Sequence, residues 1–180
     1  MFFKRIRKTI YEQDPSIHSL FESYFHPWFR AFIYYKISHY FYLRKHYSLA
    51  RWISMKAKKK TGMEIHPGAM IGENVFIDHG LGVVIGETAV IKNNVTIFQN
   101  VTLGGRGNSK GKRHPTIEEG CLIGAGAKIL GNITIEKNSK VGANAVVLHD
   151  VPSNTTVVGI PARVIKSRFN HSKKKTTSYK

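Results

Sequence analysis

The sequence predicts a mainly β protein, a left-handed parallel β-helix of hexapeptide repeats with an N-terminal α-helical cap. Two observations lead to this fold class. From Ile65 onward, branched apolar residues recur at every sixth position, and a small or branched residue follows most of them four positions later. Residues 1–63 lack this period and carry helix start and stop signals instead. We therefore expect a helical cap over 1–63, a β-helix catalytic domain over 64–165 and a basic tail over 166–180.

Three helices are expected in the cap. Asp14 and Pro15 are typical of a helix N-cap followed by Pro in the first turn. A second helix is predicted from Pro27, and a third is predicted to stop at the Thr61–Gly62 pair. The apolar face of the second helix comprises Phe29, Phe32, Ile33, Ile37, Tyr40 and Phe41. The third carries Leu49, Trp52 and Ile53.

The repeats form the coil. Their branched positions are Ile65, Ile71, Ile77, Ile85, Ile91, Ile97, Leu103, Ile117, Ile123, Ile129, Ile135, Val141 and Val147. A period of six fits neither the helical period of about 3.6 residues nor the alternation of an isolated strand. If each unit is a short strand and a turn, the branched residue points inward, and Gly or Asn takes the turn conformations. Three units then make one triangular coil, whose left-handed winding is an exception to the usual right-handed crossover.

The period is broken twice. The step from Ile77 to Ile85 is eight residues, and the step from Leu103 to Ile117 is fourteen. The second break is filled by the polar, Gly-rich stretch GGRGNSKGKRHPT. A solenoid tolerates such excursions because each coil contacts only its neighbours, and loops on a rigid scaffold are where binding and catalytic residues concentrate. We therefore look for chemistry at these two places.

Charge is concentrated in the two flanks of the chain. Residues 1–63 carry 13 basic and 3 acidic side chains, residues 64–165 carry 9 and 8, and residues 166–180 carry 6 and 0. Such flanks could bind nucleic acid, an anionic membrane surface or an anionic cofactor. Solvated faces are favoured, because the basic residues are interleaved with helix-compatible aromatics or lie in a polar tail. After Pro161 we expect a short α or coil segment and then a disordered tail, SRFNHSKKKTTSYK.

The single cysteine, Cys121, excludes an intramolecular disulfide framework and leaves too few thiols for a zinc cluster. It occupies the small apolar position of a repeat, so a packing role is expected. The N-terminal stretch lacks the pattern of a secretory signal, and no window reaches the roughly 18 apolar residues of a membrane span. These features predict a cytoplasmic protein.

Two histidines mark the breaks in the period. His79 lies beside the first break, and His114 closes the second. Histidine is the side chain whose ordinary pKa permits proton transfer near neutral pH, and a carboxylate bonded to its far nitrogen fixes the tautomer. Glu64 and Asp78 are both candidates for that carboxylate. The sequence leaves the choice between them open.

The chain resembles the serine O-acetyltransferases, which transfer acetyl from acetyl-CoA to the hydroxyl of L-serine. Four runs carry the resemblance, namely TGMEIHPGAMIGENVFIDHGLGVVIGETAVI, VTLGGRGNSKGKRHPTI, IGAGAKILG and VVGIPARVI. Many hexapeptide acyltransferases share the repeats, whereas DHGxGxVIGETA together with GKRHPTI is particular to this family. The resemblance implies acetyl-CoA as co-substrate, no metal, and a general base at His79 paired with Glu64, where many members have Asp.

The same resemblance implies a binding site for a zwitterion. Asp14 and Asp78 would hold the serine ammonium, while Arg113 and His114 would hold its carboxylate. These types suit the task, because Arg offers a planar two-donor fork to a carboxylate. The residues implied to lie along acetyl-CoA are Gly105, Ala125 and Ala143, with Lys140 near its phosphates. The family also places each active site between subunits, which implies a homotrimer or a dimer of trimers.

The chain departs from the family at three places. Arg106 stands where Thr is common, and SYFHPWFRAF replaces a stretch that usually reads like YxGxHA and is one residue longer. The chain also ends in SYK rather than in an Ile-bearing acidic tail, which argues against a stable cysteine synthase complex. An altered cap leaves homoserine or a sugar open as acceptor. A non-enzymatic basic scaffold for a membrane or nucleic acid is a further alternative, but it would not explain the Asp-His and Arg-His pairs.

Overall fold

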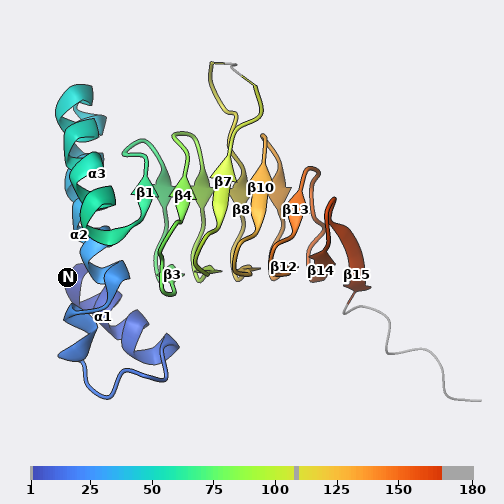
Figure 1. The fold of residues 1–180 in the computed structure, drawn as a ribbon, viewed down its shortest axis with the longest axis horizontal. Coiled ribbons are helices and arrows are strands. Elements are labelled where there is room, and N and C mark those ends of the chain that lie inside the picture. Colours follow the sequence, from blue (N-terminus) through green and yellow to red (C-terminus); the bar gives the residue numbers. More distant parts are fainter. Residues whose placement is uncertain (1, 108–109, 168–180) are drawn as a thin grey trace, which may run out of the picture.

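The computed structural model describes residues 2–107 and 110–167. Helices gather at one end, the coil extends from them, and a hairpin closes the far end (Figure 1). The helices are α1 (Phe2–Gln13), the 3-10 turn η1 (Glu22–Tyr24), α2 (Pro27–Leu43) and α3 (Tyr47–Thr61). Within the described part of the chain, no helix is both long and apolar enough to cross a membrane.

The coil is built from short strands that lie on three sheets. The first sheet contains β1 (Glu64–Ile65), β4 (Val84–Ile85), β7 (Thr102–Gly104), β10 (Lys128–Leu130) and β13 (Val146–Val147). The second contains β2 (Met70–Ile71), β5 (Val90–Ile91), β8 (Thr116–Ile117) and β11 (Thr134–Ile135). The third contains β3 (Phe76–Ile77), β6 (Thr96–Ile97), β9 (Leu122–Ile123), β12 (Lys140–Val141), β14 (Thr155–Val158) and β15 (Arg163–Ser167). Pairing between successive coils is parallel, which confirms the predicted β-helix.

The core runs along the axis of the coil as stacked columns of branched side chains. In the first sheet the column consists of Ile65, Ile85, Leu103, Ile129 and Val147, and each of these side chains is at most 5% exposed. Burial of one such side chain contributes about 1.5–3 kcal/mol. The small slot beside the columns holds Cys121, which is 1% exposed and whose thiol donates to the carbonyl oxygen of Glu136 at 3.0 Å. The packing role predicted for this cysteine is confirmed.

Asparagine supplies the corners of the coil. Asn74, Asn94 and Asn138 have φ values of +54°, +58° and +57°, a left-handed conformation that Asn tolerates better than most residues. The corner amides also bond from coil to coil. Asn74 Nδ2 donates to Asn94 Oδ1 at 3.1 Å, and Asn94 Nδ2 donates to Glu119 Oε1 at 3.1 Å. The repeated Asn therefore sets both the turn and the stacking of the coils.

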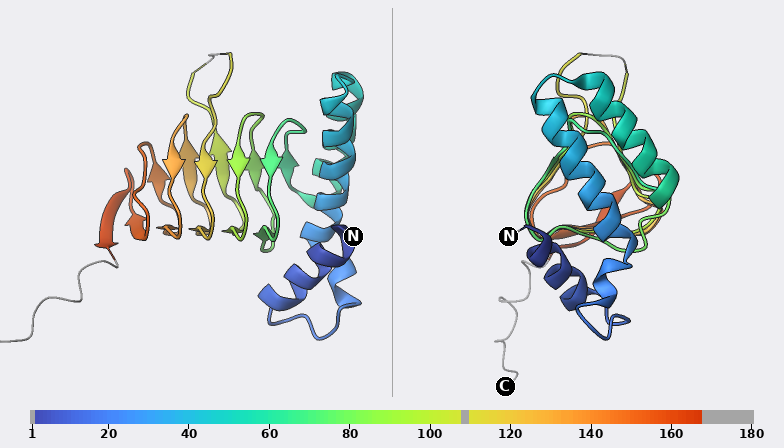
Figure 2. Two further views of the ribbon diagram at one scale, coloured as in Figure 1. Left: turned by 180° about the vertical axis from the view of Figure 1, so that it is seen from behind. Right: turned by 90° about the vertical axis from the view of Figure 1, so that its left-hand side faces the viewer.

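The cap helices close the open end of the first coil, as the right-hand view of Figure 2 shows. Trp28 Nε1 donates to the carbonyl oxygen of Val75 at 2.8 Å, and the Tyr35 hydroxyl donates to that of Ala69 at 2.9 Å. Backbone groups on the outer edge of a sheet would otherwise lack partners. Helix α2 begins at Pro27 and α3 ends at Thr61, as the sequence predicts, with Gly62 at φ +72° ending α3.

Three expectations about these elements are wrong. Asp14 is not a helix N-cap; it follows α1, and its carboxylate accepts from the backbone of Ser16 in a turn. Ile37 and Tyr40 of the predicted apolar face are 45% and 50% exposed. The segment after Pro161 forms β15, which pairs antiparallel with β14 and covers its open edge. The predicted disordered tail lies almost entirely outside the described residues.

Candidate active site

The two breaks in the period lie at different corners of the triangular coil. The segment 78–83 joins β3 on the third sheet to β4 on the first sheet. The segment 105–115 joins β7 on the first sheet to β8 on the second sheet. The first sheet forms one side of the triangular coil. Within one chain, the two groups of candidate residues therefore lie at opposite ends of this side.

The first group is an acidic cluster formed by Asp14, His26, Asp78 and His79. The side-chain ligand atoms of Asp14, His26 and Asp78 all lie within 4.8 Å of one another. His26 Nε2 is 3.8 Å from Asp14 Oδ2, and His79 Nε2 is 3.9 Å from Asp78 Oδ2. The structure thus joins residues of the cap to the first break in the coil.

Asp14 is held as an anion in this cluster. Burial raises the pKa of its carboxyl. Hydrogen bonds from the side chain and backbone of Ser16 lower this pKa, as do the nearby His26 and His79. The net result is a pKa below the ordinary value. The Ser16 hydroxyl and N–H donate to Asp14 Oδ1 at 2.7 and 2.9 Å. The second oxygen faces the cluster.

His79 is presented to solvent by a left-handed turn. Its φ is +57°, and its side chain is 72% exposed, so the imidazole is accessible to a substrate. Gly80 follows with φ +75°, and a Cβ there would lie 1.7 Å from the Met63 side chain. Only glycine permits this approach, which brings the turn at His79 against the chain next to Glu64.

Glu64 has other partners. Lys58 Nζ donates to its Oε2 at 2.6 Å, and Arg51 Nη2 to its Oε1 at 3.4 Å. The hydrogen bond from Lys58 lowers the pKa of Glu64, burial opposes this effect, and Arg51 adds to it. Within residues 2–107 and 110–167 no hydrogen bond or ion pair joins Glu64 to His79. The assignment of Glu64 as partner of the base stays a prediction.

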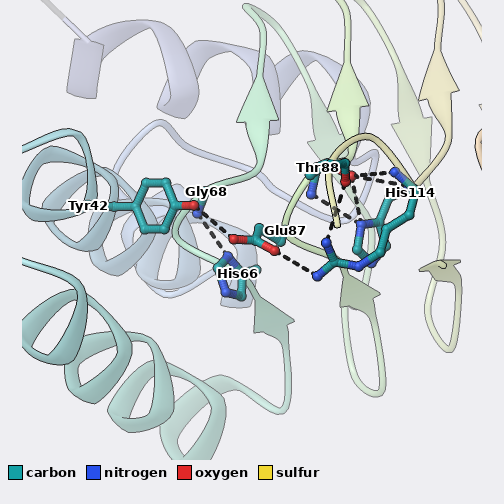
Figure 3. Close-up of polar contacts among 8 residues, drawn as sticks. Tyr42, His66, Gly68, Glu87, Thr88 and His114 are labelled. Carbon is teal, nitrogen blue, oxygen red and sulfur yellow. Dashed lines mark hydrogen bonds and ion pairs between the residues drawn. The ribbon is translucent and has the colours of Figure 1, made fainter. Parts of the chain in front are cut away.

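The second group is a cationic cluster on the long segment 105–115. Arg113 Nη2 donates to Glu87 Oε2 at 2.6 Å, and the Tyr42 hydroxyl donates to Glu87 Oε1 at 2.9 Å. Figure 3 shows Tyr42 reaching Glu87 from helix α2. The hydrogen bonds from Arg113 and Tyr42 lower the pKa of Glu87. A groove of about 380 Å³ adjoins this contact and is lined by Tyr42, Tyr47, Arg51, His66, Pro67 and Glu87.

His114 is fixed by Thr88 (Figure 3). The Thr88 N–H donates to His114 Nδ1 at 3.2 Å, and the Thr88 hydroxyl oxygen accepts from the N–H groups of Arg113 and His114 at 3.0 and 3.1 Å. Because Nδ1 accepts, a neutral His114 carries its proton on Nε2. Burial lowers the pKa of His114, and Arg113 lowers it further. A Cβ on Gly86 would lie 2.1 Å from Nε2, so this ring position requires glycine.

The four residues expected along acetyl-CoA occupy two corners. Ala125 and Ala143 lie at the same corner of neighbouring coils, because Asn144 N–H donates to the carbonyl oxygen of Ala125 at 2.8 Å. Lys140 is exposed on β12, which precedes that corner. Gly105 follows β7 and lies at the next corner. The structure therefore brings Ala125, Ala143 and Lys140 to one side of the coil and Gly105 to another.

Sequence reasoning missed several residues of the site. Tyr42, Thr88 and His26 were not singled out, and Glu87 was quoted only within its motif. Glu87 and Thr88 lie inside the motif VIGETA, which was a usable signal. For His26 the signal was its position directly before Pro27 at a helix start.

The comparisons with known proteins agree with this geometry. Residues 68–99 match the model described as hexapeptide repeat of succinyl-transferase, and residues 114–149 match bacterial transferase hexapeptide (six repeats). The serine acetyltransferase of Bacillus subtilis (strain 168) is 55% identical over 169 residues, which cover 92% of this chain and 78% of the relative.

Two solved structures extend the likeness. A serine acetyltransferase from Brucella abortus strain S19 in complex with coenzyme A is 40% identical with a TM-score of 0.89, over 92% of this chain and 67% of that one. A serine acetyltransferase from Neisseria gonorrhoeae in complex with serine is 42% identical with a TM-score of 0.85, over 90% of this chain and 67% of that one.

A left-handed coil of six-residue repeats, with histidines mounted on its interruptions, defines an acyltransferase of the hexapeptide-repeat class. The match to the Brucella abortus structure covers 92% of this chain, so it includes the helical cap as well as the coil. The chain belongs to the serine acetyltransferase family.

Proposed function

We propose that this chain transfers the acetyl group of acetyl-CoA to the hydroxyl of L-serine, yielding O-acetyl-L-serine and CoA, the first step from serine to cysteine. The observation that carries the proposal is the presence of two carboxylates, Asp14 and Asp78, and of the Arg113 guanidinium beside the Nε2–H donor of His114, on the scaffold of this family. A zwitterion needs both signs of charge, whereas a neutral sugar needs neither.

The proposed mechanism is direct transfer within a ternary complex. The imidazole of His79 takes the hydroxyl proton of serine as the oxygen attacks the carbonyl carbon of the thioester. The C–S bond of the tetrahedral intermediate then breaks, and the proton passes to the leaving thiolate. Glu64 is proposed to orient the imidazole, in addition to accepting from Lys58 and Arg51. General-base assistance is worth roughly 100- to 10,000-fold, and positioning of two substrates adds to it.

Ala125, Ala143, Lys140 and Gly105 are proposed to line the acetyl-CoA site. The alanines present small side chains at one corner, and Lys140 supplies an exposed positive charge for a phosphate. The single reduced cysteine and the proposed place in metabolism favour a cytoplasmic enzyme.

The acceptor can be tested directly. With acetyl-CoA at a fixed concentration, release of the CoA thiol is expected with L-serine, with a much lower kcat/KM for homoserine and for sugars. Homoserine places its hydroxyl one methylene farther from the charged groups, and misplacement of a reacting group by about 1 Å costs on the order of 100-fold. Equal rates with serine and a neutral sugar would contradict the proposal.

We further propose that the active form is a trimer or a dimer of trimers, in which His79 faces His114 of the partner subunit. One side of a coil, at about six residues, spans roughly 15–20 Å, too far for the two histidines of one chain to hold one serine. Two chains that meet corner to corner would complete the site.

Subunit complementation tests this arrangement. A mixture of His79→Ala and His114→Ala chains, unfolded and refolded together, is expected to regain activity that neither variant has alone. Random assembly gives both wild-type histidines at about a quarter of the interfaces. Light scattering on the same sample measures the mass. Co-assembled trimers that regain nothing, or a monomer with full activity, would show that the site lies within one chain.

A further inference from the structure

His26 has an environment that helix capping alone does not explain. It precedes α2, its ring is 7% exposed, and it faces two carboxylates that come from different parts of the chain. Asp14 follows α1, and Asp78 follows β3. The Asp14 and Asp78 side chains are 16% and 23% exposed, so the cluster is partly roofed and opens beside His79.

The tautomer of His26 follows from its contacts. The N–H of Trp28 donates to His26 Nδ1 at 3.2 Å, so this nitrogen is an acceptor. Burial lowers the pKa of His26, while the carboxylates of Asp14 and Asp78 raise it in part. The ring is therefore neutral near pH 7, and its one proton sits on Nε2. That N–H is the group directed at the carboxylates.

The same tautomer argues against a metal ion in the cluster. A cation on Nε2 would displace its proton, and the neutral ring would then carry a proton on Nδ1, facing the N–H of Trp28. Two donors would then oppose each other in a buried place. The separation of 3.8 Å between His26 Nε2 and Asp14 Oδ2 exceeds a hydrogen bond and suits an electrostatic contact or a bridging water.

We propose that His26 is a positioning residue that holds the carboxylates of Asp14 and Asp78 side by side, as a doubly negative site for the ammonium group of an amino-acid acceptor. Two carboxylates this close repel each other. The Nε2–H dipole of the neutral ring, acting across 3.8 Å or through a bridging water, offsets part of the repulsion, yet it leaves the full negative charge for the ligand. A protonated histidine would cancel half of it. The inference rests on the proposed function and adds the residue that selects an ammonium-bearing acceptor.

Two substitutions separate the role of His26 as the N-cap of helix α2 from its role as an N–H donor toward the carboxylates. Asn is among the best N-cap residues, so His26→Asn keeps an acceptor for the N–H of Trp28, but its side chain is too short to reach the carboxylates. His26→Gln keeps an N–H donor at about the reach of Nε2 and is a weaker cap. A positioning role predicts that the serine KM rises more in His26→Asn, which lacks the donor, whereas a role in helix capping alone predicts that it rises more in His26→Gln, which is the weaker N-cap.

We expect His26→Asn to raise the serine KM roughly ten-fold, the size of one water-mediated hydrogen bond to a charged group, with little change in the acetyl-CoA KM. His26→Gln is expected to keep a serine KM near that of the wild type. Both variants lose the ring that packs on Phe76, with 5.5 Å between ring centroids, so both are expected to unfold at lower urea. A wild-type serine KM in His26→Asn, or a larger rise in His26→Gln, would overturn the inference. Turnover of serine by the wild type in the same assay tests the proposed function separately. If the wild type does not acetylate serine, the proposed function is wrong. If the wild type is active and His26→Asn has an unchanged serine KM, only the role of His26 is wrong.

Discussion

Replacement of His79 by alanine is expected to lower kcat by about 100- to 10,000-fold, the range of general-base assistance. The side chain is 72% exposed and contributes little packing, so the loss should come from the chemistry and not from the core. The serine KM should change much less than kcat. Steady-state measurement of both parameters by CoA release tests this expectation.

The backbone at His79 calls for a second variant. With φ at +57°, alanine there is expected to cost roughly 1 kcal/mol of stability, since a Cβ without a polar group disfavours the left-handed region. Asn occupies this conformation at Asn74 and Asn94, so His79→Asn should remove the base and keep the turn. Both variants should lose activity equally while differing in melting temperature. A fall of less than about 10-fold in His79→Asn would end the assignment of the general base.

Replacement of Arg113 by alanine is expected to raise the serine KM by roughly 10- to 100-fold, in line with loss of a hydrogen-bonded charge, and to leave the acetyl-CoA KM nearly unchanged. The guanidinium fork is proposed to serve the acceptor carboxylate, and the change should be confined to that substrate. Equal increases in both KM values would instead assign Arg113 to the phosphates of the donor.

Glu87 provides the matched control for Arg113. Its carboxylate accepts from Arg113 and Tyr42, so Glu87→Gln removes the charge that anchors the guanidinium without removing the guanidinium itself. A smaller rise in the serine KM, with the same selectivity over acetyl-CoA, is expected. A larger effect in Glu87→Gln than in Arg113→Ala would mean that Glu87 contacts a substrate directly.

The coil could be predicted from sequence because each coil repeats the same local physics. A branched residue every six positions specifies the inward direction, and Asn or Gly at the corners specifies the turns. The start of α2 and the end of α3 were predictable for a similar reason, since Pro27 and Gly62 act locally.

The errors arise where one residue type serves two local structures. Asp before Pro is typical of a helix N-cap, but an Asp that accepts from the N–H two residues ahead also makes a turn, as Asp14 does with Ser16. Strand β15 was missed because it pairs antiparallel and lies outside the six-residue period.

The contacts of the site could be predicted even less. Tyr42 and Glu87 are 45 positions apart, and Glu87 and Arg113 are 26 apart, so no short pattern encodes their meeting. Glu64 shows the same difficulty. Both Asp78 and Glu64 were candidates for the carboxylate that orients His79, and in the structure Glu64 accepts a hydrogen bond from Lys58. The sequence identified the residue types needed for the chemistry, whereas the packing of cap against coil determines their partners.

The burial of Cys121 means that the reactivity of this thiol reports on unfolding of the coil. Burial raises the pKa of this thiol to about 11, and the side chain is 1% exposed, so a dye that reacts with thiolates has no target in the folded chain. In a colorimetric measurement of turnover, all of the signal then comes from the product. Once the coil around β9 opens, a single further equivalent becomes reactive, because the chain contains one cysteine. Its rate of labelling without substrates follows the opening of the solenoid at its middle, with no engineered probe.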